Sequence, residues 1–298
     1  MASTTAPDSP PATTLREFAL TPTRSTFAAS RTALGALILR DLVVLRKNIG
    51  EFVVRTVIQP FLLVFVFLYV FPSIGQGVGG GGGKVQESAF ATVLVPGVVA
   101  ISIMFQGIQA VALQLSTEFG YTREIEDRVQ APCPIWLVAV AKVLSGAVQG
   151  VLAAVIVFPI AAVIHTKGVQ AHLTVHWAIL LTLIPLACVA MTSLGLLLGT
   201  VFEPRNIGLM FGFVVLPLTF LGGTYYQWTR LASVQIDGFH WLQTLVLVNP
   251  LIYVAEGMRA ALTEAQHMSL WAVYPVLVGF CVLFMTLGLR SFRDRVLV

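Results

Sequence analysis

A glycine run is the part of this sequence that comes nearest to a nucleotide-binding motif. The segment GQGVGGGGGKV covers residues 75–85. A phosphate-binding loop needs a glycine six positions before its lysine and a hydroxyl-bearing residue directly after it. Val78 and Val85 occupy these two positions around Lys84. We therefore interpret the run as a flexible connector and expect this chain to bind no cofactor, so that any energy the protein uses would be supplied by another chain.

Three histidines are the other residues whose spacing suggests chemistry. His172 and His176 stand four positions apart, as metal ligands on one helix face do, and His165 lies close by. Residues 164–177 contain no carboxylate or cysteine that would complete such a site. We favour histidines at a membrane interface over zinc ligands, so the sequence predicts no catalytic residue, no metal site and no enzyme.

The composition places these residues in a membrane. Of 298 residues, 57% are hydrophobic and only 11% are charged, against about 25% charged in soluble domains. This predicts an all-α integral membrane protein, for which a net charge of +4 concerns orientation rather than nucleic-acid binding. Residues 1–30 lack the apolar core of a secretory signal, and we expect them to form a disordered cytoplasmic tail.

Six apolar stretches are long enough to cross a bilayer: 57–74, 89–115, 135–164, 177–201, 207–226 and 270–289. With the N-terminus inside, 14 of the 18 lysines and arginines fall on the inner side. The positive-inside rule thus predicts a multi-pass plasma-membrane protein with both termini cytoplasmic, a six-span domain over 57–289 and a short tail over 290–298.

Residues 31–56 precede the first span and have two faces. At 100° per residue, Leu34, Ile38 and Leu42 lie on one arc, and Arg40 and Lys47 lie on the opposite arc. This pattern predicts an amphipathic helix in the membrane interface, among the lipid headgroups. The alternative is that the segment merely extends the first span.

Polar side chains recur at helical spacing in the second and third spans. Ser102, Gln106 and Gln109 fall near one line, and Ser145 and Gln149 are one turn apart. Such stripes either hydrogen-bond neighbouring helices together or line a route for a substrate, so these residues are the candidates for a translocation pathway.

Pairs of glycines mark two further spans. Gly195 and Gly199, and Gly208 and Gly212, have the spacing that lets helix backbones approach closely. We expect both pairs to pack against other helices.

The segment 227–265 is too apolar for a loop and too interrupted for a span. Asn249 and Pro250 have the types preferred at a helix start. Glu256 and Arg259 follow one turn apart, close enough to pair. We expect two short helices that dip into the outer leaflet and return, with protein around their broken ends.

The most charged part of the chain lies between the second and third spans. It reads TEFGYTREIEDRVQAPCP, and we expect Gly120 to adopt left-handed backbone angles where the helix turns out of the membrane. Taken alone, this segment could be a solvated turn.

In three places the chain resembles the membrane subunits of type-2 ABC exporters, which include multidrug, lipid and polysaccharide exporters. The segment EFGYTREIEDRVQAPCPIWLVAVAKVL is similar to the family's cytoplasmic motif, with Glu118, Phe119, Gly120, Pro132 and Lys142 at the matching positions. FLGGTYYQW is similar to the end of its fifth span. NPLIYVAEGMRAAL is similar to its outer signature, through Asn249, Pro250, Leu251, Tyr253, Glu256 and Arg259. One departure is Thr117, where the family often has arginine.

The resemblance implies a permease subunit for efflux that forms the passage with a second permease chain, identical or not, while a separate subunit hydrolyses ATP. It also implies that segment 118–134 contacts that ATPase through Glu118, Phe119, Gly120, Arg123, Glu124, Asp127 and Arg128. The neutral, aromatic-rich pathway favours a hydrophobic drug-like molecule or a lipid, with a lipid-linked polysaccharide as the alternative. An ion-coupled secondary transporter is a further alternative, although no inverted repeat or ionisable residue at mid-membrane indicates one.

Overall fold

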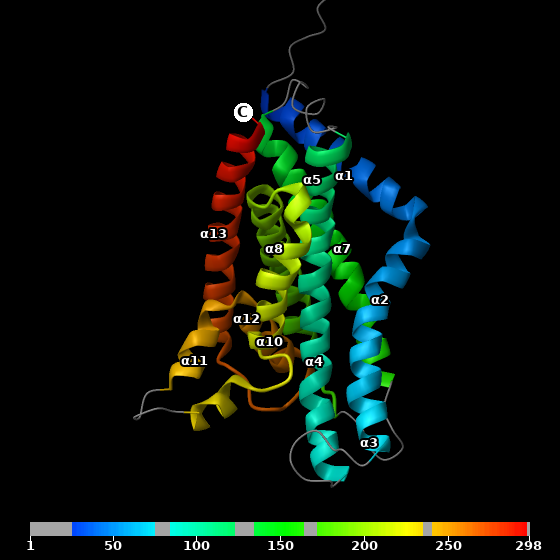
Figure 1. Cartoon of the computed structure of the whole chain (residues 1–298), viewed down its shortest axis with the longest axis vertical. Coiled ribbons are helices and arrows are strands. Elements are labelled where there is room, and N and C mark those ends of the chain that lie inside the picture. The colour runs from blue at the N-terminus through cyan, green and yellow to red at the C-terminus, as the bar shows by residue number, and fades with distance from the viewer. Residues whose placement is uncertain (1–25, 75–83, 123–133, 164–171, 235–239, 297–298) are drawn as a thin grey trace, which may run out of the picture.

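The structure is a computed structural model that describes residues 26–74, 84–122, 134–163, 172–234 and 240–296 (Figure 1). In this part of the chain every regular element is helical. Six helices are long and apolar enough to cross a membrane: Ile49–Val70, Ser88–Gly120, Ile135–Ile160, Trp177–Val201, Pro204–Leu221 and Leu270–Val296. The predicted all-α membrane fold is confirmed. The glycine run 75–83 lies outside the described residues.

Helix α1 (Thr26–Lys47) lies across one end of the bundle, near the last turn of α13 (Leu270–Val296), at the top of Figure 1. We call this the α1 end. Apolar positions at helical spacing, such as Leu34, Leu37 and Leu42, are half-buried, and α1 packs against α7 (Ile135–Val163). One face of α1 therefore belongs to the bundle.

The boundary between α1 and the first span differs from the predicted one. The helix predicted for 31–56 stops at Lys47, Asn48 interrupts it, and α2 (Ile49–Phe65) begins directly after. The sequence pattern extended the interfacial helix too far because Glu51 and Arg55 continue its spacing of charges. The first span therefore starts with charged residues in its first two turns.

The core of the bundle is α8 (Trp177–Val201), which packs against α13, α7 and α4 (Lys84–Ile108). Its middle is buried on all sides, including Ala187, Met191 and Leu194. Helix α13 does not stop at 289 but continues to Val296. Arginines are good helix formers whose long side chains reach water from a helix end, so the predicted tail 290–298 begins as an extension of the last span.

Among the described residues, four wide, π-helical turns interrupt the spans: Val66–Val70 before α3 (Phe71–Ser73), Gln109–Leu113 before α5 (Gln114–Thr117), Glu118–Thr122 after α5, and Phe211–Val215 between α9 (Ile207–Met210) and α10 (Leu216–Leu221). Such turns are rare and often occur at functional sites. Two of them begin at residues with predicted roles, Gln109 and Glu118. A constant rotation of 100° per residue, as in an ideal α-helix, does not predict the change in side-chain direction that each wide turn causes.

The segment after α10 turns back into the bundle. A 3₁₀ turn, Trp228–Ser233, precedes α11 (Trp241–Leu245), a second 3₁₀ turn, Val246–Val248, and α12 (Pro250–Leu262). The stretch Trp241–Val248 and α12 are bent by 96° relative to each other. Every residue of α12 is buried, and the helix packs against α4, α8 and α13. The segment lies towards the end of the bundle opposite α1 (Figure 1).

The two glycine pairs have different surroundings. A Cβ on Gly195 would lie 2.9 Å from the Gly107 carbonyl oxygen, and one on Gly199 would lie 2.8 Å from Ala112 Cα. The expected packing is confirmed for this pair, which brings α8 against α4. Gly208 and Gly212 have open space around them in the described part of the chain. The expected packing is therefore not found for this second pair within one chain.

Gly199→Ala should lower the thermal midpoint of the purified protein, because the added methyl overpacks the α8 contact at a cost of about 1–3 kcal/mol. Gly279→Ala is the matched control, since Gly279 lies in α13 with nothing within 4 Å of an added Cβ. Equal midpoints for the two variants would contradict the close approach of α8 and α4.

Candidate functional site

The predicted ATPase-contact segment begins on a buried ion pair at the α1 end. Glu118 Oε1 lies 2.5 Å from Lys142 Nζ on α7, and both side chains are almost fully buried. Lys142 also donates to Gln114 Oε1 over 3.4 Å. The two motif residues thus bind each other, and they fix the end of α5 against α7.

Gly120 has a different role from the one we predicted. It lies inside the wide turn Glu118–Thr122, and Gly223 is the glycine with positive φ in the described part of the chain. A Cβ on Gly120 would lie 2.7 Å from Cβ of Pro204. The expected left-handed conformation is therefore wrong: the site needs a glycine because Pro204 approaches closely.

Phe119 is held by the end of α13. Its ring lies 6.0 Å from that of Phe292, centroid to centroid, and Cζ of Arg295 lies 4.7 Å from its ring centroid. Arg295 Nη1 also donates to the carbonyl oxygens of Gly199, Thr200 and Phe202 over 2.9–3.3 Å. One guanidinium therefore joins the start of the contact segment, the end of α8 and the end of α13.

Sequence reasoning counted Arg295 only as a positive charge near a terminus. Its partners at the end of α8 are backbone carbonyls, which have no sequence signature. The remaining predicted contact residues, Arg123, Glu124, Asp127 and Arg128, lie outside the described part of the chain.

The two polar stripes meet in the structure. Thr56 Oγ1 of α2 donates to Gln106 Oε1 over 3.2 Å, and Gln106 Nε2 donates to Gln149 Oε1 over 3.3 Å. Ser102 donates back to the Val98 carbonyl, whereas the buried Ser145 Oγ has no partner within the described residues. This relay joins α2, α4 and α7, as expected of side chains that hold helices together. Thr56 was not among the predicted residues.

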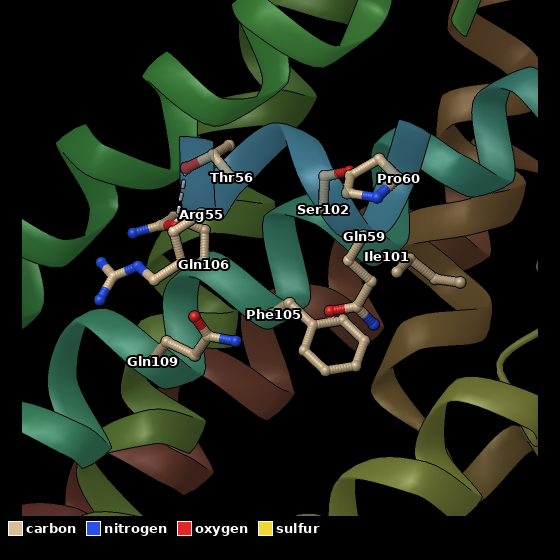
Figure 2. A pocket seen from close by; sticks show the side chains of 9 residues that line it. All are labelled: Arg55, Thr56, Gln59, Pro60, Ile101, Ser102, Phe105, Gln106 and Gln109. Atoms are coloured by element: carbon tan, nitrogen blue, oxygen red, sulfur yellow. Dashed lines mark hydrogen bonds between the residues drawn. The ribbon is translucent and has the colours of Figure 1, made fainter. Parts of the chain in front are cut away.

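The same stripe borders open space along the seam between α2 and α4. A narrow cavity of about 20 Å³ lies in this seam and adjoins a cavity of about 500 Å³ between α1, α2, α5 and α7; Arg55 and Gln109 line both. Figure 2 shows the narrow part, with Arg55 and Gln59 from α2 and Phe105 and Gln109 from the facing helix. The stripe therefore hydrogen-bonds helices together and also borders a cavity, and its use as a translocation pathway stays a prediction.

The outer signature begins with the predicted helix cap. Asn249 Oδ1 accepts from the Leu251 amide over 2.9 Å, and its Nδ2 donates to the Leu218 carbonyl over 2.8 Å. Pro250 follows as the first residue of α12. Tyr253 OH donates to the Leu247 carbonyl over 3.0 Å. The cap is confirmed, and it also ties α12 to α10.

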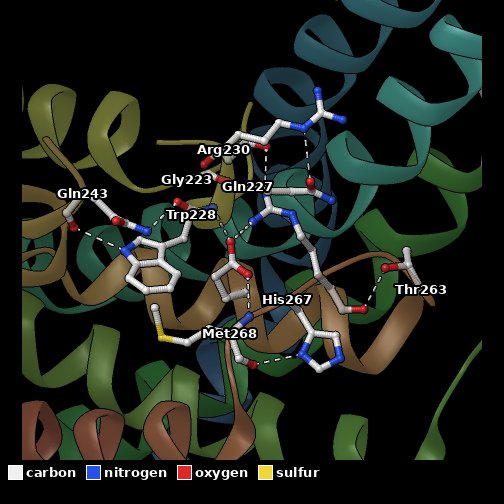
Figure 3. A network of polar contacts seen from close by, with 11 residues as sticks. Gly223, Gln227, Trp228, Arg230, Gln243, Thr263, His267 and Met268 are labelled. Atoms are coloured by element: carbon white, nitrogen blue, oxygen red, sulfur yellow. Dashed lines mark hydrogen bonds and ion pairs between the residues drawn. The ribbon is translucent and has the colours of Figure 1, made fainter. Parts of the chain in front are cut away.

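Glu256 and Arg259 form the predicted pair, and it is fully buried, with 2.8 Å between Nη1 and Oε1. Figure 3 shows the contacts around it. The Glu256 carboxylate accepts from the Trp228 and Met268 amides over 2.8 and 2.9 Å. Arg259 Nη2 donates to the carbonyl oxygens of Gly223 and Thr224. The pair thus satisfies irregular backbone on both sides of α12.

Arg259→Gln should abolish stable folding or lower the thermal midpoint strongly. Removing one member of a buried ion pair typically costs about 3–5 kcal/mol, because the other charge stays buried. The control is Arg230→Gln, which removes an exposed cation from the same region and should leave the midpoint unchanged. Similar midpoints for both variants would show that the pair does not hold the segment together.

Arg295→Gln should also destabilise the protein, by about 1–3 kcal/mol, because carbonyl oxygens at the end of α8 lose their donor. Arg293→Gln is the control, since the Arg293 side chain is 66% exposed. If the Phe119 contact matters, Phe119→Leu should cost less in the Arg295→Gln background than alone. If the losses of stability in the two single variants simply add in the double variant, the Phe119 and Arg295 contacts are independent of each other.

Comparison with known proteins places this architecture in a family. The model of the ABC-2 type transporter family matches residues 32–263, well over half of the chain. The inner membrane transport permease YadH of Escherichia coli K12 is 28% identical over 244 residues, which cover 80% of this chain and 88% of YadH. The YadH proteins of Escherichia coli O157:H7 and Shigella flexneri match to the same extent. The chain belongs to the ABC-2 type transporter family and is a multi-pass membrane permease subunit of that family.

Proposed function

We propose that this chain is the permease subunit of an ATP-driven exporter, and that a separate nucleotide-binding subunit hydrolyses ATP with Mg²⁺. A second permease chain, a copy or a paralogue, would complete the passage. The cargo would be a hydrophobic drug-like molecule or a lipid. Both termini would be cytoplasmic, so the α1 end would face the ATPase.

The observation that carries this proposal is the rigid attachment of the segment predicted to contact the ATPase. Glu118 is tied to Lys142, and Phe119 is held by Phe292 and Arg295. A push on the residues that follow would therefore be transmitted to α7, α8 and α13. A buried ion pair would not be expected at the start of a turn that is merely solvated, because burying two charges costs free energy.

Support for a second permease chain comes from the span Pro204–Leu221. Its side chains Leu209, Phe213, Leu216 and Phe220 are exposed, Phe213 by 78%. Gly208 and Gly212 lie on the same span, and no described residue of this chain comes within 4 Å of a Cβ added to either. A helix of another chain could approach closely here.

The test pairs transport with subunit assembly. Vesicles containing this permease and its ATPase should export a lipid or dye only with ATP, and the permease alone should hydrolyse none. Reversing the charges of Glu124 and Asp127 together should reduce transport severalfold and weaken co-purification of the ATPase, since each exposed contact contributes about 1 kcal/mol or less. Reversing Glu264, which is exposed on the loop between α12 and α13, is the control.

Three outcomes would favour other functions. Transport that needs an ion gradient but not ATP would indicate an ion-coupled secondary transporter. ATP-dependent export confined to glycan-bearing lipids would indicate the polysaccharide alternative. Unchanged transport and co-purification in the double variant would return the segment to a solvated turn.

A further inference from the structure

Arg55 is a cation inside a membrane span without a counter-ion. It belongs to the span Ile49–Val70, six residues after its start, which is about 9 Å along a helix axis. Its side chain is exposed, and within the described residues it makes no ion pair, not even with Glu51 one turn earlier. An arginine in the second turn of a span can extend its guanidinium to the headgroup region, where anionic phosphate groups lie.

The space around Arg55 is large enough for a ligand. Arg55 lines three adjoining hollows between α1, α2, α4 and α7, of about 500, 150 and 20 Å³. Lys142 borders the largest hollow, but its charge is matched by Glu118 at 2.5 Å. Arg40 borders it too, and the carboxylates of Asp41 and Glu51 line the wider part. Arg55 is the cation shared by all three hollows.

The seam changes from polar to apolar along its length. Near Arg55 it offers the amide of Gln109, and farther along it is lined by Gln59, Pro60, Ile101 and Phe105. The outer face of α2 beside it carries exposed apolar side chains, including Val54, Ile58 and Leu62. A molecule that matches this surface has an anionic head, a nearby apolar body and access from the membrane.

We propose that the seam between α2 and α4 binds a phosphate-bearing amphiphile of the phospholipid class. Its phosphate would lie on the Arg55 guanidinium, which forms strong paired hydrogen bonds to phosphate oxygens. Gln109 would donate to the same group, and the carboxylates of Asp41 and Glu51 would accept hydrogen bonds from the ammonium of a zwitterionic head. As a statement about cargo, this rests on the proposed export function; as a statement about binding, it concerns this chain alone.

Binding of phosphatidylethanolamine to the purified permease, followed by native mass spectrometry, tests the site. Arg55→Gln should weaken binding about tenfold, the loss expected for one charge-assisted contact, whereas Arg55→Lys should lose less, because it keeps the charge but not the paired hydrogen bonds. Arg46→Gln is the matched control, because Arg46 is an exposed cation on α1 that lines none of the three hollows. Diacylglycerol with the same acyl chains should bind weakly, and excess inorganic phosphate should not displace the lipid.

Each opposite result overturns the inference. An equal loss in Arg46→Gln would mean unspecific attraction to a basic surface. Diacylglycerol binding as tightly as the phospholipid would exclude phosphate recognition. Displacement by inorganic phosphate would identify a site for the free anion instead. Because no ATPase takes part, these results stand apart from the transport test: lipid binding without ATP-dependent export would leave the site valid and reject the proposed function.

Discussion

Inside a bilayer no water is available to satisfy a broken backbone, and this constraint dominates the half of the molecule farthest from α1. Helix α12 is bent sharply against the stretch before it and is followed directly by a loop. Backbone groups of Gly223 and Trp228 in the irregular stretch after α10, and of Met268 in the loop after α12, are satisfied by the α12 side chains Glu256 and Arg259. The ion pair therefore acts less as an attraction between two charges than as a set of donors and acceptors for unpaired peptide groups.

At the α1 end the same requirement is met differently. The last carbonyls of α8 lie within reach of Arg295, a residue far away in sequence, and the end of α5 is closed by Glu118 with Lys142. In both places a charged side chain, itself held in position by other contacts, closes the end of a helix. As a result this end of the bundle is held together by charged side chains, while α2 beside it leaves open space along its inner side. Firmly held contacts beside an open seam are what the proposed permease would need to transmit motion and still admit a ligand.

The sequence was sufficient for whatever depends on local pattern. Apolar length predicted the six spans, and Asn249 with Pro250 predicted the start of α12. The Glu256 and Arg259 pair followed from spacing along one helix. Local pattern failed where a distant partner decides: Gly120 is determined by Pro204, and Arg295 by the end of α8. It also failed at Asn48: the charged residues keep a regular helical spacing across this position, but the helix itself is interrupted there.

The wide turn at Gln109–Leu113 separates the membrane part of its span from the residues that lead out of it. Such a turn is equivalent to a single residue inserted into an α-helix, and each residue of an α-helix advances the direction of side chains by about 100°. The direction in which Glu118 points relative to Ser102 is thus determined by chain length as well as by side-chain identity. During evolution, the gain or loss of one residue here would re-aim the contact segment relative to the membrane part of the same span.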